Sequence, residues 1–198
     1  MINEDSTDPR VIRTCQLLRE ALRKLVERRS FSTLSVKDIT EEAGLNRSTF
    51  YLHYTGLHEL LEDYTRVLFN ELREDIYGGG ISGSKWGPEQ VEPYVELVFH
   101  HLKKYQAFYK SMLGKRGDPY FNRLFQDLLS ELLFKPIANS FDRRNPELSS
   151  ALILRFYCNG FTGIASWWLD NDMPIAIPEA SQRISRDILP GYMQLMQV

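Results

Sequence analysis

Apolar residues recur at steps of three and four along almost the whole chain, and this helical period limits the possible folds more than any other feature. In the first such run, one face is formed by Val11, Cys15, Leu18, Leu22 and Leu25. A helix with 3.6 residues per turn places residues at these spacings on one side. No stretch has the alternation of a half-buried strand or the turn signal of a hairpin. The sequence therefore predicts an all-α protein.

Capping residues and helix breakers divide this pattern into about nine helices. Asp8 and Pro9 begin the first, Ser35 caps the second, Gly44 ends it, and Asn46 caps the third. Further helices are expected at about 56–77, 88–105, 106–113, 118–141, 147–169 and 179–195, with a loop at the Gly-rich residues 78–84. We expect two parts: a three-helix unit over residues 1–55 and a helical body over 56–198.

Composition and charge narrow the class of protein. The 198 residues are 43% hydrophobic, enough for a substantial core. No apolar run reaches the roughly 18 residues of a membrane span, and the start is acidic and polar, so we expect a cytoplasmic protein. Between Arg10 and His58 there are nine basic and five acidic residues, against fifteen and twenty-one elsewhere. This basic segment favours contact with a polyanion, although charged helix faces are often only solvated.

The second and third helices are joined by a short turn containing Gly44, as in a helix-turn-helix. The third helix turns Arg47, Ser48 and Tyr51 outward, whereas Phe50 and Tyr54, four residues apart, turn inward. Its outer face therefore carries polar groups where a core helix has aliphatic ones. Such a helix can enter the major groove of DNA, where a guanidinium can bind guanine and hydroxyls can reach bases or phosphates. The alternative is an ordinary helical hairpin whose polar face meets only water.

From Leu34 to Leu61 the sequence resembles the DNA-binding region of TetR-type bacterial transcription regulators (the TetR/AcrR family). This resemblance implies about nine helices, a helix-turn-helix unit on an effector-binding body, and a homodimer, most often a repressor, on a palindromic operator. Where the family usually has Lys at the start of the fourth helix, this chain has Leu57 followed by His58. Either the phosphate contact of that Lys is absent here, or His58 replaces it in part. The motif is carried by Ser35-Val36, Ile39-Thr40, Ala43-Gly44-Leu45-Asn46 and Thr49-Phe50-Tyr51-Leu52-His53-Tyr54.

Residues at the starts of the second, third and fourth helices and along the third make up the predicted DNA contact. The start of the second helix offers free N–H groups and a positive dipole to a phosphate. The predicted DNA-binding residues are Ser35, Val36, Lys37, Asn46, Arg47, Ser48, Thr49, Tyr51, His53, Tyr54 and His58.

The segment Phe156 to Pro174 resembles the Gly-x-x-Gly and Trp-rich helix of a Firmicutes-type subgroup related to regulators of dihydroxyacetone kinase operons. Its two glycines allow close approach of helices and its rings are large apolar groups. These features fit either contact in a homodimer or packing inside one subunit. The predicted dimer interface comprises Phe156, Gly160, Gly163, Trp167, Ile184 and Ile188.

The helices between about 93 and 141 are rich in aromatic rings, which can serve core packing or line a pocket. The family resemblance implies an effector site in this body. We expect a neutral or weakly polar aromatic small molecule, with a protein partner as the other possible effector. The predicted pocket residues are Phe99, His100, Phe108, Tyr109, Phe121, Phe125 and Phe156.

Other kinds of site find little support in the sequence. His53 and His58, and His100 and His101, lack the spacing of a helical zinc pair, and Walker, GxSxG and GxGxxG motifs do not occur. We therefore expect no metal, no cofactor and no catalytic residues. Two alternatives stay open: a dimeric interaction protein of this fold that has lost DNA binding, and an enzyme that uses an aromatic pocket.

Overall fold

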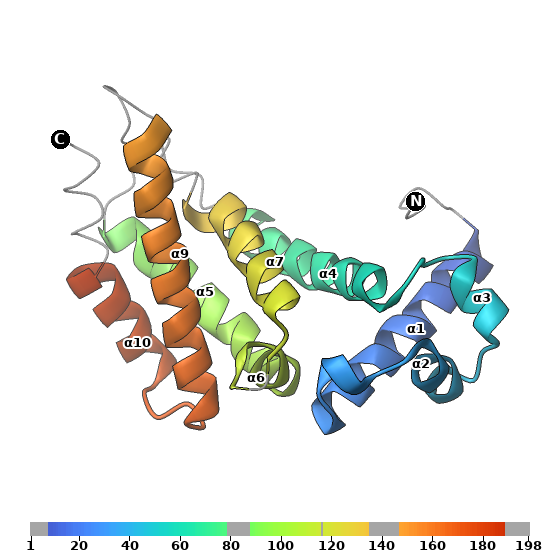
Figure 1. Cartoon of the computed structure of the whole chain (residues 1–198). Coiled ribbons are helices and arrows are strands. Elements are labelled where there is room, and N and C mark those ends of the chain that lie inside the picture. Colours follow the sequence, from blue (N-terminus) through green and yellow to red (C-terminus); the bar gives the residue numbers. More distant parts are fainter. Residues whose placement is uncertain (1–7, 79–87, 116, 135–146, 189–198) are drawn as a thin grey trace.

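The computed structural model describes residues 8–78, 88–115, 117–134 and 147–188. Within these residues every regular element is a helix, and no strand occurs, which confirms the all-α prediction. Figure 1 shows α1, α2 and α3 gathered at one end of the molecule and α9 and α10 at the other. The helices are α1 (Pro9–Arg28), α2 (Val36–Ala43), α3 (Arg47–Tyr51), α4 (Leu57–Gly78), α5 (Pro88–Lys104), α6 (Gln106–Leu113), α7 (Pro119–Leu129), α9 (Glu147–Asp170) and α10 (Ile177–Arg183). Shorter turns are η1 (Phe31–Thr33), η2 (Ser130–Phe134) and η3 (Ile184–Ile188).

The local signals that begin and end the first helices act as the sequence predicts. The Asp8 carboxylate accepts a hydrogen bond from the backbone N–H of Arg10 at 2.8 Å, and Pro9 opens α1. Ser35 and Asp38 form a reciprocal capping box at the start of α2. Gly44 ends α2 in the left-handed conformation with φ 67°. These caps satisfy backbone groups that a helix end leaves without partners.

The N-terminal unit, which we define as α1, η1, α2 and α3, packs its apolar faces together and against the start of α4. Leu18 and Leu22 of α1, Ile39 of α2, Phe50 of α3 and Leu60 of α4 are each 0% exposed. Burial of such side chains contributes roughly 1.5–3 kcal/mol each before the cost of ordering the chain. The short α3 is therefore held by its contacts, because five residues are too few for a stable helix in isolation.

Aromatic rings fill the centre of the helical body. The ring of Phe108 meets Tyr64 at 5.0 Å and Phe121 at 5.4 Å between centroids, and the ring of Phe125 meets Tyr109 and Phe69, each at 5.6 Å. These pairs are near edge-on, the arrangement that the quadrupoles of the rings favour. They join α4, α6 and α7 into one core.

Two helix boundaries differ from the expected ranges. The helix expected at 118–141 is α7, which ends at Leu129 and continues as a π-helical turn to Phe134. The last helix begins at Ile177, two residues earlier than expected, because Pro178 lies in its first turn, where its missing N–H costs nothing. The predicted helical residues 135–141 and 189–195 and most of the Gly-rich loop lie outside the described residues.

In the part of the chain that the structure describes, every helix is too short or too polar to cross a membrane.

Candidate nucleic-acid interface and apolar pocket

The exposed face of α3 presents a cation and hydrogen-bonding groups to solvent. Arg47 and Ser48 are exposed, and the Tyr51 side chain is 52% exposed. Among the described residues, no carboxylate pairs with the Arg47 guanidinium. Asn46 caps the helix through its extended backbone and leaves its exposed side chain without a capping bond. This face can therefore offer a guanidinium, a hydroxyl, an amide and a phenol to an outside partner.

The opposite face of α3 is fixed by rings. The Phe50 side chain is fully buried, and its ring meets those of Tyr51 and Tyr54 at 5.5 and 5.7 Å. Tyr54 is only 2% exposed, and its hydroxyl donates to Oδ2 of the buried Asp63 at 2.6 Å. Nε of Arg19 lies 3.6 Å from the same carboxylate oxygen. The predicted DNA contact of Tyr54 is thus corrected: its hydroxyl ties the end of α3 to α4.

Burial raises the pKa of the Tyr54 phenol, and the hydrogen bond to Asp63 acts in the same direction. The phenol therefore stays protonated and remains a donor. The carboxylate of Asp63 accepts this bond inside the unit, where a carboxylate without partners would be costly.

The start of α2 is occupied by groups of the chain itself. The Ser35 hydroxyl donates to Oδ2 of Asp38 at 2.6 Å, and a terminal nitrogen of Arg29 lies 2.9 Å from Oδ1. These hydrogen bonds, with that of Ser35 first, lower the pKa of Asp38 to about 2. Val36 is half-buried against the core, whereas Lys37 is exposed and pairs with Glu41 at 3.6 Å. Lys37 is thus the cation that this helix start presents to solvent.

The remaining predicted contacts lie at the edge of this surface. Thr49 and His53 are half-buried, and the His53 ring lies 6.5 Å from that of Tyr54. His58 meets the ring of Phe31 at 5.3 Å and the ring of Tyr120 at 4.7 Å, both edge-on. Phe31 belongs to η1 and Tyr120 to α7, so His58 lies between the N-terminal unit and the body. His58 is exposed, so its contact with a phosphate stays a prediction beside these ring contacts.

Leu52, which directly follows α3, is a surface residue that sequence reasoning did not assign. It is 80% exposed, more than any other large apolar side chain described. Its position between Tyr51 and His53, two predicted DNA-binding residues, was the sequence signal that could have identified it. An exposed leucine that directly follows Tyr51 can contact a thymine methyl group, which is an apolar feature of the major groove.

The structure places the predicted effector residues in two different environments. Five of the rings are packed into the core and are at most 1% exposed: Phe99, Phe108, Tyr109, Phe121 and Phe125. His100 is exposed and lies 3.7 Å from the Glu96 carboxylate. Only Phe156 of the predicted set lines the pocket described next. The predicted location of the effector site is therefore corrected, because these five rings pack against one another in the core.

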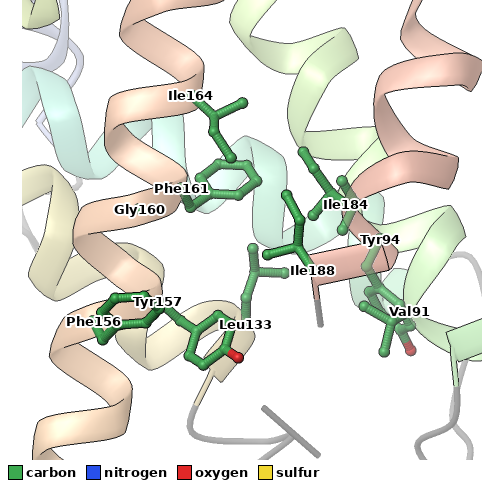
Figure 2. Close-up of a pocket in the computed structure, with 11 residues that line it drawn as sticks. Val91, Tyr94, Leu133, Phe156, Tyr157, Gly160, Phe161, Ile164, Ile184 and Ile188 are labelled. Atoms are coloured by element: carbon green, nitrogen blue, oxygen red, sulfur yellow. The ribbon is translucent and has the colours of Figure 1, made fainter. Parts of the chain in front are cut away.

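An apolar pocket of about 150 Å³ opens between α5, α9 and η3. Figure 2 shows Phe161 and Leu133 on one side and Ile184 and Ile188 on the other, facing the same space. No side chain with a charge lines it. We call this the apolar pocket; its lining comprises Val91, Tyr94, Val95, Leu133, Phe156, Tyr157, Gly160, Phe161, Ile164, Ile184 and Ile188.

Four of the predicted dimer residues form a continuous exposed line on α9, which we call the α9 stripe: Phe156, Gly160, Gly163 and Trp167. Phe156 is 72% and Trp167 48% exposed. A Cβ added at either glycine would meet nothing within 4 Å, so the backbone between the two rings is open to contact. Ile188 is also exposed, whereas Ile184 is buried against the body and reaches only the apolar pocket.

Comparison with known proteins gives a consistent family for both parts of the chain. Residues 18–64 match the family described as bacterial regulatory proteins, tetR family. Residues 89–189, more than half of the chain, match the family described as transcriptional regulator C-terminal region, of the TetR type.

Individual relatives agree with this assignment. The chain is 26% identical over 148 residues to the dhaKLM operon transcriptional activator DhaS of Lactococcus lactis, a match that spans 72% of each chain. It is 38% identical over 60 residues to the HTH-type transcriptional regulator YxbF of Bacillus subtilis, which covers 30% of this chain and 16% of that protein.

Solved structures have the same fold at low sequence identity. A TetR transcriptional regulator from Streptococcus agalactiae superposes with a TM-score of 0.68 at 21% identity, covering 99% of this chain and 100% of the other. The dihydroxyacetone kinase operon activator DhaS superposes with a TM-score of 0.57 at 18% identity, covering 92% and 97%. From the family matches over both parts and this shared fold, we conclude that the chain belongs to the TetR family of bacterial transcriptional regulators.

Proposed function

We propose that this protein regulates transcription as a homodimer that binds a palindromic operator, with its affinity for DNA modulated by an effector bound to the body. The observation that carries the proposal is the exposed face of α3, where Arg47 has no carboxylate partner among the described residues while Phe50 behind it is fully buried. Arg47 is therefore available to an acidic partner, and its place on a short helix held by Phe50 supports DNA as that partner.

The expected DNA contacts divide into two kinds. Arg47 can bind the O6 and N7 acceptors of guanine, and Tyr51 and Leu52 can contact thymine methyl groups or sugars. Lys37 and the backbone at the start of α2 can contact phosphates, which position the unit without reading sequence. The hydrogen bond from Tyr54 to Asp63 of α4 holds α3 in place from its buried side.

The short length of the recognition helix supports a homodimer. Five residues can contact only a few base pairs, and two copies related by a two-fold axis double the contacts on a palindromic site. The two α3 helices then enter successive major grooves about 34 Å apart. The α9 stripe supplies the exposed apolar surface for the association.

Regulation requires that the effector prefer one arrangement of the two N-terminal units. The apolar pocket supports a small apolar effector, and a protein partner is the other candidate. In either case, a shift between arrangements changes the distance between the two α3 helices and hence their fit to the operator.

The direction of regulation is a separate question. Repression is the expectation from the family resemblance, whereas DhaS of Lactococcus lactis is named as an activator of the dhaKLM operon. A promoter–reporter measurement with the gene deleted and restored decides between them: deletion raises expression for a repressor and lowers it for an activator.

The central experiment is capture and sequencing of genomic DNA fragments by the purified protein, followed by gel shifts on the enriched site. Arg47→Ala should weaken operator binding by about 1–3 kcal/mol. Arg183→Ala is the matched control, since Arg183 is exposed on α10 and pairs with Glu179 at 2.9 Å, at the far end of the molecule (Figure 1). Binding should also weaken steeply as salt rises. No enriched site, or equal loss in both variants, would refute DNA recognition by α3.

A further inference from the structure

The lining of the apolar pocket selects a class of ligand. Its eleven residues offer aliphatic groups and rings, and the only side-chain polar atoms among them are the hydroxyls of Tyr94 and Tyr157. An ion would lose its hydration there without gaining a partner. A cavity of about 150 Å³ with such a lining holds a neutral molecule near the size of benzene.

The pocket shares one wall with the α9 stripe. Phe156 and Gly160 belong to both, and Phe156 is the more exposed of the two rings of the stripe. On the other side, the side chain of Ile188 is 41% exposed. The described residues of one subunit therefore leave this apolar space open along the α9 edge, where surface from beyond that edge can enclose a ligand.

The α9 stripe is symmetric along the sequence. Phe156 lies four residues before Gly160, and Trp167 lies four residues after Gly163. If two copies of α9 cross in opposite directions about a two-fold axis between Phe161 and Thr162, Gly160 faces the partner subunit's Gly163. The same operation places Phe156 opposite the partner subunit's Trp167. The glycine backbones of the two α9 helices then meet at the axis, and a large ring lies on each side of them. This arrangement allows the close packing of two helices.

We propose that the apolar pocket is a binding site for a small neutral aromatic molecule that becomes complete only in the dimer, where the partner subunit's Trp167 closes over Phe156. This inference rests on the proposed homodimer and adds the register of its interface, the class of ligand and the link between them. Because the site needs both copies, the ligand strengthens the dimer, and by reciprocity the dimer strengthens ligand binding by the same factor.

The variant Gly163→Leu distinguishes loss of the dimer and of ligand binding from misfolding. Gly163 does not line the pocket, and a side chain added there meets nothing within 4 Å in the single subunit. The variant should keep its helical content by circular dichroism, because leucine favours a helix more than glycine does. It should sediment as a monomer at micromolar concentration, because the two backbones can no longer approach.

The probe is fluorobenzene, followed by fluorine NMR, with fluorobenzoate as the charged molecule of matched shape. Wild-type dimer should bind fluorobenzene saturably and not fluorobenzoate. Gly163→Leu and Trp167→Ala should bind it about tenfold more weakly or worse, a coupling within the usual range. Val67→Ala, which removes an exposed apolar group from α4, should behave as wild type. In sedimentation, fluorobenzene should lower the dimer dissociation constant of the wild-type protein.

The possible outcomes test the shared ligand site and the homodimer separately. Equal binding by wild type and monomeric Gly163→Leu shows a site complete in one subunit and overturns the inference, while operator binding by the dimer stays intact. A dimer that binds operator but no fluorobenzene also overturns the inference. A wild-type protein that is monomeric on operator DNA refutes the proposed homodimer itself.

Discussion

Two side chains near the end of α3 have different roles, because one faces the core and the other faces solvent. Phe50 is 0% exposed, whereas Leu52 is 80% exposed. Phe50→Ala should lower the free energy of unfolding by about 3–5 kcal/mol, since it removes a buried ring. Leu52→Ala should leave stability within about 0.5 kcal/mol but weaken operator binding. Urea denaturation and gel shifts measure the two effects, and equal stability losses would contradict this division.

A buried histidine makes the stability of the body depend on pH. Nε2 of His101 lies 3.0 Å from the Tyr109 hydroxyl, and its Nδ1 has no hydrogen-bond partner, with the nearest carboxylate oxygen of Glu71 4.0 Å away. Burial lowers the pKa of His101 from 6.5 to about 4, although the charge of Glu71 acts in the opposite direction. Between these two values the unfolded chain binds a proton that the folded chain does not, so stability falls as pH falls.

Replacement of this histidine should flatten the pH dependence. Between pH 7 and pH 5, His101 contributes a loss of about 2 kcal/mol in the free energy of unfolding. His101→Gln should lack this loss. His100→Gln is the control, because His100 is exposed on the same helix and should leave the wild-type slope unchanged. Urea denaturation at the two pH values gives the comparison, and a slope in His101→Gln equal to that of wild type would exclude His101 as its source.

At the scale of elements, the turn between α2 and α3 depends on backbone conformation. Gly44 has φ 67°, where a Cβ is unfavourable, although a Cβ there would meet no neighbour within 4 Å. Gly44→Ala should therefore cost roughly 1 kcal/mol of stability through conformation alone. Gly56→Ala is the matched control, because that site is equally open and its φ is not positive.

The two glycine variants also test whether the turn positions α3. If Gly44 sets the angle between α2 and α3, operator affinity should fall more in Gly44→Ala than its stability loss explains at temperatures where the variant remains folded. Gly56→Ala should retain both affinity and thermal midpoint. Equal melting temperatures in the two variants would show that the left-handed conformation is not needed.

At the scale of the whole molecule, two groups of contacts fix the N-terminal unit to the body. The Ser111 hydroxyl of α6 donates to the backbone carbonyl of Val26 at the end of α1. His58 lies edge-on to both Phe31 and Tyr120. We propose that these contacts transmit a displacement of α6 or α7 to the unit that carries α3 when an effector binds to the body.

Removal of the Tyr120 ring should loosen this junction. Tyr120→Ala is expected to speed hydrogen exchange around Phe31 and His58 and to weaken operator binding about 3–10-fold, since the unit must be ordered on binding. Tyr120→Phe keeps the ring and should match wild type in both measurements. Fluorobenzene binding should be unchanged in both variants, because Tyr120 does not line the apolar pocket. If hydrogen exchange is unchanged in Tyr120→Ala, the contacts of Tyr120 do not fix the N-terminal unit to the body.

The sequence by itself determined what depends on near neighbours. The caps at Asp8, Ser35 and Gly44 act through hydrogen bonds and backbone angles within four residues, and the inward position of Phe50 follows from helical period. Tertiary structure alone decided that Tyr54 bonds to Asp63, that His58 lies between Phe31 and Tyr120, and that most predicted effector rings fill the core. It also decided that the pocket forms from α5, α9 and η3. Periodicity shows which face of a helix is apolar, whereas the partner of that face is set by the packing of distant segments.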